Sequence, residues 1–101
     1  MIPKSVTLNK NKKSIQFEYP NHTYLLLTSS YLRACSPSAE NKNKQNELEV
    51  SKKIKAFNSV LISKVEAVGN YAIRIIFDDG HNTGIFSWEY IYTIGSRFQD
   101  S

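Results

Sequence analysis

The sequence predicts a small α+β domain with two layers, a mainly antiparallel sheet of about five to six strands and a layer formed by a C-terminal helix and one short helix. Apolar and polar residues alternate along several short segments, as in half-buried strands. Gly69-Asn70 separates two strongly apolar segments, which is typical of a hairpin turn. Trp88, Ile91 and Tyr92 have the spacing of one helix face. A chain of 101 residues, 41% of them hydrophobic, is long enough for one core of this kind.

The N-terminal segments predict three strands. Apolar residues alternate with polar ones over residues 6–8 and again over 15–19, and the Asn-Lys-Asn-Lys sequence of residues 9–12 forms a turn between them. Pro20-Asn21-His22 signals the next turn, because proline and asparagine favour turn conformations. The apolar run from Tyr24 to Leu27 is then a third strand.

A short helix and a polar loop follow the third strand. Ser29 or Ser30 can cap a helical turn through Tyr31-Leu32-Arg33, which must end before Pro37 because the residue before a proline avoids helical geometry. Residues 38–53 contain three apolar side chains and show no periodicity. We therefore expect a mobile polar loop at about 38–57.

The C-terminal segments predict a hairpin, a second turn and a helix. Val60 to Val68 and Tyr71 to Phe77 are the hairpin strands, the turn at 78–84 leads into a short strand, and Ser87 caps the helix. Gly95 is expected to end this helix, so residues 1–95 form the single domain and residues 96–101 a loose tail. Tyr90 lies on the face opposite Trp88 and is expected to be exposed.

Composition narrows the class of protein. No apolar run approaches the roughly 18 residues that span a bilayer, and the N-terminus has no signal-peptide pattern. The single Cys35 agrees with a cytoplasmic protein and is expected to be buried rather than reactive. The net charge of +4 comes from lysines in loops that also carry glutamates, which favours a solvated surface over a phosphate-binding stripe.

Four segments, in order along the chain, resemble one known family. Tyr31-Leu-Arg-Ala-Cys-Ser-Pro-Ser-Ala-Glu40 is similar to its Tyr-Leu-Arg-x-x-Ser-Pro-Ser-Ala-Glu motif. Val68-Gly-Asn-Tyr-Ala72, Phe77-Asp-Asp-Gly-His-x-x-Gly-Ile-x-Ser-Trp88 and Tyr92-x-x-Gly95 resemble its later motifs. The family comprises small bacterial proteins related to the N-terminal domain of gamma-butyrobetaine hydroxylase, a domain of unknown function.

The resemblance implies an accessory role. In the hydroxylases a similar domain accompanies a separate catalytic barrel that holds iron and 2-oxoglutarate, and in some iron–sulfur scaffold ATPases a similar domain follows the ATPase. Neither catalytic partner is contained in these 101 residues. We therefore expect no enzymatic activity, and a protein partner linked to iron–sulfur or iron-dependent proteins.

The resemblance also implies a structural zinc site in the hydroxylases, formed by three cysteines after the Leu-Arg pair and one histidine in the later loop. His81 matches the histidine, whereas Ser36, Ser38 and Asn41 stand at the cysteine positions and Cys35 is displaced by one. Hydroxyl groups are poor substitutes for thiolates as zinc ligands. We therefore expect no cofactor, and expect Ser36 and Ser38 to lie near His81 and to be joined to it by hydrogen bonds.

The two polar motifs supply the candidate site. Arg33 can recognise a carboxylate or phosphate by its planar fork, with an internal salt bridge as the alternative. Asp78 and Asp79 are expected to form a turn in which the adjacent side chains point apart. No nucleophile motif or phosphate-binding glycine loop occurs, so no catalytic residue is assigned. The predicted binding surface comprises Arg33, Ser36, Ser38, Glu40, Asp78, Asp79, His81 and Asn82.

The function that we predict is that of a small non-catalytic accessory or interaction module. The first alternative is a metal-binding protein that holds iron or zinc through His81 and the nearby acids Asp78 and Asp79. The second alternative is weak nucleic-acid binding through the lysine-rich loops. No membrane partner is expected, and the sequence leaves the oligomeric state open.

Overall fold

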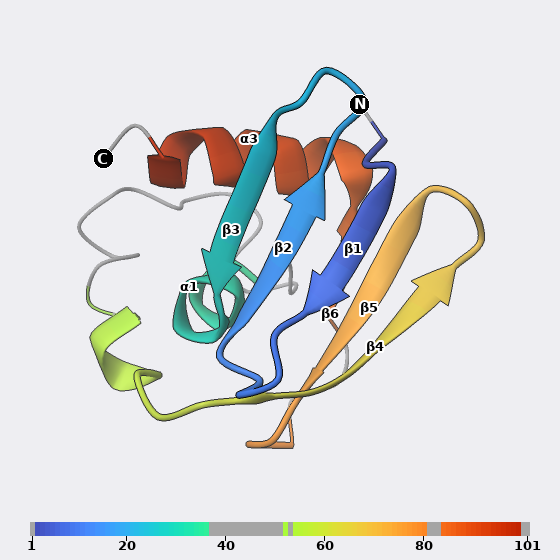
Figure 1. The fold of residues 1–101 in the computed structure, drawn as a ribbon. Helices are drawn as coiled ribbons and strands as arrows, with labels where there is room; N and C mark the ends of the chain where they lie inside the picture. The colour runs from blue at the N-terminus through green and yellow to red at the C-terminus, as the bar shows by residue number, and fades with distance from the viewer. Residues whose placement is uncertain (1, 37–51, 53, 81–83, 100–101) are drawn as a thin grey trace.

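The computed structural model describes residues 2–36, 52, 54–80 and 84–99, and it has the predicted α+β class. Along the described residues, three strands are followed by a short helix, and three further strands by a C-terminal helix (Figure 1). The elements are β1 (Ser5–Leu8), β2 (Ser14–Glu18), β3 (Tyr24–Thr28), α1 (Ser29–Ala34), β4 (Ile62–Val68), β5 (Ala72–Phe77), β6 (Gly84–Ser87) and α3 (Trp88–Gln99).

The strands form two antiparallel three-stranded sheets, with orders β1-β2-β3 and β4-β5-β6. In the first sheet Ile15 pairs with Leu27, so the buried residues of β2 and β3 share one face. In the second sheet Ile73 pairs with Phe86, and both side chains are buried. The alternation that the sequence shows therefore marks the inner faces of both sheets.

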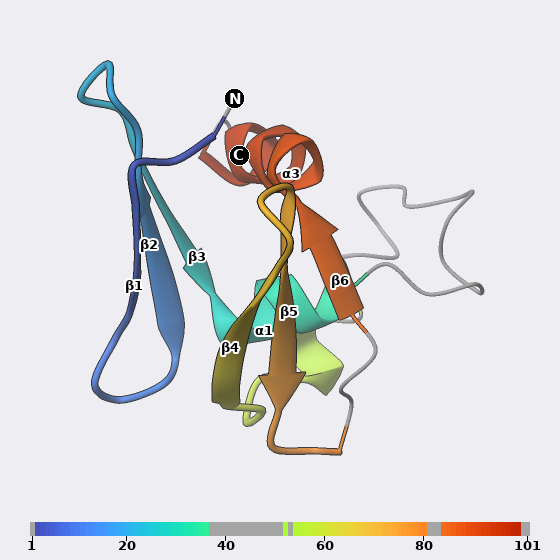
Figure 2. The same ribbon diagram turned by 90° about the vertical axis from the view of Figure 1, so that its right-hand side faces the viewer.

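One layer is the sheet β1-β2-β3, and β4-β5-β6 lies with α1 and α3 on one side of it (Figure 2). The core between these layers includes large side chains from the first sheet, such as Phe17, and from the second, such as Phe77. The two sheets are also joined through the backbone, since the Ile62 N–H donates to the Lys12 carbonyl at 2.8 Å. Burial of both inner faces stabilises this arrangement.

The predicted end of the last helix is wrong. Helix α3 continues through Gly95 to Gln99, so residues 96–99, which we expected in a loose tail, are helical. A β-carbon built on Gly95 would lie 2.6 Å from Cδ1 of Leu25 on β3. Gly95 therefore permits close contact between helix and sheet rather than ending the helix.

The predicted mobile loop is too long at its C-terminal end. Residues 52 and 54–56 are helical, and Ile54 and Phe57 pack against the core. The turn at Gly69-Asn70, in contrast, forms as predicted, with Gly69 at a φ of +55°. Glycine adopts this left-handed conformation without the steric cost that a β-carbon brings.

Candidate binding site

Helix α1 places Arg33 beside the end of β5. The helix begins after Thr28, whose side chain accepts a hydrogen bond from the Tyr31 N–H at 3.2 Å. The Tyr31 hydroxyl donates to the Ile94 carbonyl at 2.7 Å and so ties α1 to α3. Because both ends of this six-residue helix are anchored, Arg33 in its last turn has a fixed position.

Arg33 contacts two residues that are distant in sequence. Its Nε atom lies 2.9 Å from Oδ2 of Asp79, which forms the internal salt bridge that we considered. Its guanidinium carbon lies 4.3 Å from the ring centroid of Phe57, within the range of a cation–π contact. The Arg33 side chain is 19% exposed, so it reaches the surface with its guanidinium held by an ion pair and an aromatic ring.

Asp78 has a structural partner. Its Oδ1 accepts a hydrogen bond from the Leu61 N–H at 3.0 Å, while its own N–H donates to the Leu61 carbonyl at 2.9 Å. The carboxylates of Asp78 and Asp79 therefore bond to different segments of the chain, as expected for a turn in which adjacent side chains point apart. Asp78 fixes the start of β4, and Asp79 fixes Arg33.

Cys35 and Ser36 continue from α1 into the interior. The Cys35 side chain is buried, as predicted, and 2% of the residue is exposed; Ser36 is 1% exposed. The Cys35 carbonyl accepts a hydrogen bond from the Tyr90 hydroxyl at 2.5 Å. Tyr90 is thus partly buried against α1, and our prediction of an exposed Tyr90 is wrong.

We use the name α1–β5 junction for Arg33, Ser36, Phe57, Asp78 and Asp79. The structure brings four of the predicted site residues into this region. Phe57 was not among the predicted site residues, because an aromatic residue in a polar segment carries no periodic signal. The other predicted residues, Ser38, Glu40, His81 and Asn82, lie outside the described residues.

The donor set of the junction does not fit a closed zinc site. Ser36 carries a hydroxyl at a position where the resemblance implies a thiolate, and hydroxyls bind zinc weakly. Asp78 and Asp79 are already bonded to Leu61 and Arg33. Within the described ranges, no three His, Cys, Asp or Glu side chains converge as metal ligands do. Binding of iron or zinc through His81 stays a prediction.

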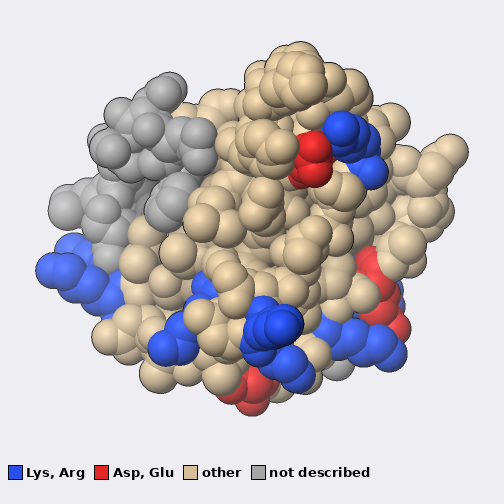
Figure 3. Space-filling view, in the orientation of Figure 1, with Lys and Arg blue, Asp and Glu red and all other residues tan. Residues whose placement is uncertain are grey.

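On the face of the molecule that Figure 3 shows, Lys and Arg side chains lie mainly along the lower edge. A further basic group lies beside an acidic one at the upper right, and the surface over β2 and β3 is largely uncharged. Lys10, Lys12 and Lys13 belong to the β1–β2 turn, and Lys52 and Lys55 to the segment before Phe57. No ion pair joins these five lysines to an acidic side chain in the part of the chain that the structure describes.

None of the described helices has the length and apolar character needed to cross a membrane.

Comparison with known proteins gives a consistent family match. The family model described as gamma-butyrobetaine hydroxylase-like, N-terminal, matches residues 6–92. A crystal structure of a protein of unknown function from the DUF971 family of Acidithiobacillus ferrooxidans is 26% identical, covers 93% of this chain and 92% of its own, and has a TM-score of 0.70.

Two structures determined by NMR in solution are also similar. They are 31% and 29% identical to this chain, each with a TM-score of 0.70. Each comparison covers 98% of this chain, and 76% and 72% of the respective relatives. A comparison with curated proteins found no match.

Proposed function

This chain belongs to the gamma-butyrobetaine hydroxylase-like N-terminal family, and from that premise we propose that it is a non-catalytic accessory module that binds a protein partner through the α1–β5 junction. The similar protein from Acidithiobacillus ferrooxidans is described as a protein of unknown function, so this relative offers no chemistry from which to argue. The family description names the N-terminal part of an enzyme, which favours a role beside a catalytic protein. We place the partner among iron-dependent or iron–sulfur proteins and the complex in the cytoplasm.

The observation that carries the proposal is the way in which the guanidinium of Arg33 is held. Asp79 binds its Nε, and Phe57 covers one face of the guanidinium. The terminal nitrogens of Arg33 have no hydrogen bond to any other described residue. Such a guanidinium is held in one orientation before binding, and its planar fork matches a carboxylate.

The charges around the junction favour an acidic partner. Asp79 offsets the charge of Arg33, whereas Lys52 and Lys55 add positive charge in the segment that leads to Phe57. A carboxylate at the terminal nitrogens of Arg33 would form charge-assisted hydrogen bonds, which are stronger than neutral ones. An acidic segment of the partner is therefore the ligand that fits.

Quantitative capture with a matched control tests the proposal. The immobilised wild-type protein, Arg33→Ala and Arg74→Ala would be incubated with a native extract, and the captured proteins quantified by mass spectrometry. Arg74 is a suitable control because it is an arginine on β5 whose nearest acid, Glu66, lies 3.7 Å away on the neighbouring strand. Thermal unfolding curves would show that each variant is folded.

We expect the wild type and Arg74→Ala to capture the same protein in equal amounts. Arg33→Ala should capture at least about tenfold less of it, because a central charged contact is lost. Equal capture by Arg33→Ala and Arg74→Ala would rule out the junction as the binding surface.

Elemental analysis of untagged wild type and His81→Ala tests the metal alternative. This alternative requires about one equivalent of bound metal in the wild type, which the variant loses. Binding to nucleic acid would be revealed by steep salt dependence.

A further inference from the structure

The backbone of β3 has a free edge. Strand β3 is the last strand of its sheet in the described structure, and it pairs with β2 alone. The Tyr19 N–H donates to the Thr23 carbonyl, and the Ser29 N–H donates to the Lys13 carbonyl. Because hydrogen-bonded pairs alternate in an antiparallel ladder, the backbone groups of Tyr24 and Leu26 face away from β2. No other described backbone group bonds to them.

The side chains along this edge are also exposed and uncharged. Tyr24 is 47% exposed and Leu26 is 50% exposed, both on the outer face of the sheet. The strand contains no proline and no charged residue, and its pairing with β2 has no shift of register. Proteins ordinarily block edge strands with such features, so β3 is an open template for a further strand.

The other edge strands of the described structure differ from β3. Strands β1 and β6 are four residues long. Strand β4 carries Lys64 and Glu66 and has a register shift between Ile62 and Lys64. Short length, charge and bulges all oppose pairing with another chain. Among these strands β3 alone combines five residues with none of these obstacles.

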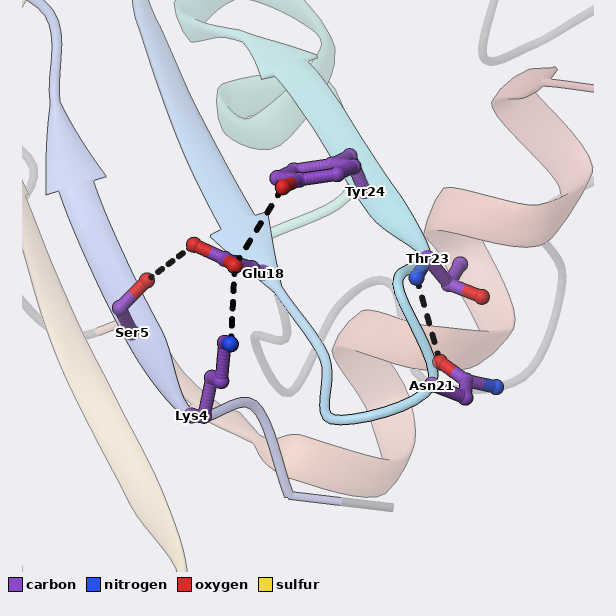
Figure 4. Close-up of polar contacts among 6 residues, drawn as sticks. All are labelled: Lys4, Ser5, Glu18, Asn21, Thr23 and Tyr24. Atoms are coloured by element: carbon purple, nitrogen blue, oxygen red, sulfur yellow. Dashed lines mark hydrogen bonds and ion pairs between the residues drawn. The ribbon is translucent and has the colours of Figure 1, made fainter.

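Among the residues that the structure describes, the acidic group near the β3 edge is Glu18, and its charge is offset by Lys4. Figure 4 shows Tyr24 and Lys4 directed toward Glu18 on β2. The Tyr24 hydroxyl donates to Oε2 of Glu18 at 3.3 Å, and Lys4 Nζ lies 3.1 Å from the same oxygen. The hydrogen bond from Lys4 lowers the pKa of Glu18. The outer face beside β3 therefore presents little net charge to an approaching chain.

We infer that the β3 edge pairs with the β3 edge of a second copy of this chain, giving a continuous six-stranded sheet about a two-fold axis at Leu26. In this register Leu26 pairs with Leu26 of the second copy through two backbone hydrogen bonds. The Thr28 N–H of each copy donates to the Tyr24 carbonyl of the other. Tyr24 and Thr28 then form an aromatic and β-branched cross-strand pair, and no charges oppose each other.

The occupant is a second copy because the edge is complementary to itself. An antiparallel pairing centred on Leu26 matches the free N–H groups of Leu26 and Thr28 with the free carbonyls of Leu26 and Tyr24, and each exposed apolar side chain with an uncharged one. One strand pair buries little surface, so the association is weak and depends on concentration. This inference concerns the β3 edge and does not depend on the α1–β5 junction.

Sedimentation velocity tests the pairing, with protein from about 10 µM to about 1 mM to cover the range of weak association. We expect the mean mass of the wild type to rise toward that of a dimer, and Leu26→Lys to weaken association at least about tenfold, because it places two like charges opposite each other. Thr7→Lys is the matched control. Thr7 is exposed and aligned with Leu26 across the sheet through Gln16, but it lies on β1.

Amide hydrogen exchange of the wild type gives a second measurement that requires no variant. With rising concentration we expect slower exchange at Leu26 and Thr28, while Leu25 and Leu27, whose amides face β2, keep the same rate. A monomer up to about 1 mM, or a dimer that Leu26→Lys leaves intact, would overturn the inference. Dimerisation without the alternating protection would likewise exclude β3 as the interface.

Discussion

Two buried tyrosines are expected to respond in opposite ways to the loss of one oxygen atom. Tyr19 is 0% exposed, and its hydroxyl has no hydrogen-bond partner within the described structure. Its ring packs edge to face on Tyr92, with centroids 5.5 Å apart. Tyr31 is 4% exposed, and its hydroxyl donates to the Ile94 carbonyl at 2.7 Å. Tyr19→Phe and Tyr31→Phe therefore form a matched pair.

The size of each effect follows from the state of the hydroxyl. A buried polar group without a partner costs about 1–3 kcal/mol, so Tyr19→Phe should raise the free energy of unfolding by about 1 kcal/mol. A satisfied buried hydrogen bond contributes about 0.5–1.5 kcal/mol, so Tyr31→Phe should lower it by about 1 kcal/mol. The two variants should differ by about 2 kcal/mol, or roughly 8–15 °C in melting temperature for a domain of this size.

Urea unfolding followed by circular dichroism measures both variants under the same conditions. The slope of the transition should stay unchanged, because neither substitution alters the surface exposed on unfolding. If Tyr19→Phe destabilises the protein as much as Tyr31→Phe does, the Tyr19 hydroxyl has a partner and the reasoning fails. The edge-to-face contact of Tyr19 with Tyr92 survives in the phenylalanine variant, so lost ring packing cannot account for such a result.

Three further predictions concern pH, packing and capping. Burial raises the pKa of Tyr19 from 10.0 to about 12, so the contribution of this group to stability is complete below pH 10 and decreases above it. The free energy of unfolding should be about 2 kcal/mol lower at pH 11.5 than at pH 9, and Tyr19→Phe should show a smaller difference. Gly95→Ala brings a β-carbon to 2.6 Å from Leu25 Cδ1. The cost of overpacking, about 1–3 kcal/mol, should outweigh the gain of about 1 kcal/mol in helix propensity, so the variant should be less stable. An increase in melting temperature would show that Leu25 can move aside. Thr28→Ala removes the cap of the Tyr31 N–H and should lower the free energy of unfolding by about 1 kcal/mol in the same urea assay, whereas no change would mean that the cap is not needed.

Local sequence patterns were sufficient to predict the strands. Residues such as Ile15 and Phe17 alternate with polar neighbours because one face of each strand is buried, and this period of two can be read without any knowledge of neighbours in space. The turn at Gly69 is equally local, since it depends on a backbone angle that glycine adopts readily. The family resemblance, carried by short motifs along most of the chain, is confirmed by the match over residues 6–92.

The candidate site depended on contacts between distant segments. Arg33 and Asp79 are 46 residues apart, and nothing in either motif shows that their side chains meet or that Phe57 covers the guanidinium. The sequence indicated Arg33 and Asp79 as candidates, but their pairing follows from the packing of α1 beside the end of β5.

The strands, the turns and the family can therefore be read from the sequence alone, because each depends on periodicity or on the preferences of single residues. The roles of Gly95 and Tyr90, in contrast, depend on contacts between elements. Gly95 resembles a helix stop in sequence, yet it lies within α3 because Leu25 of β3 occupies the space of its side chain. Tyr90 lies on the helix face opposite Trp88, yet the carbonyl of Cys35, directly after α1, accepts a hydrogen bond from its hydroxyl. Such roles arise from the way that elements pack, which no local pattern encodes.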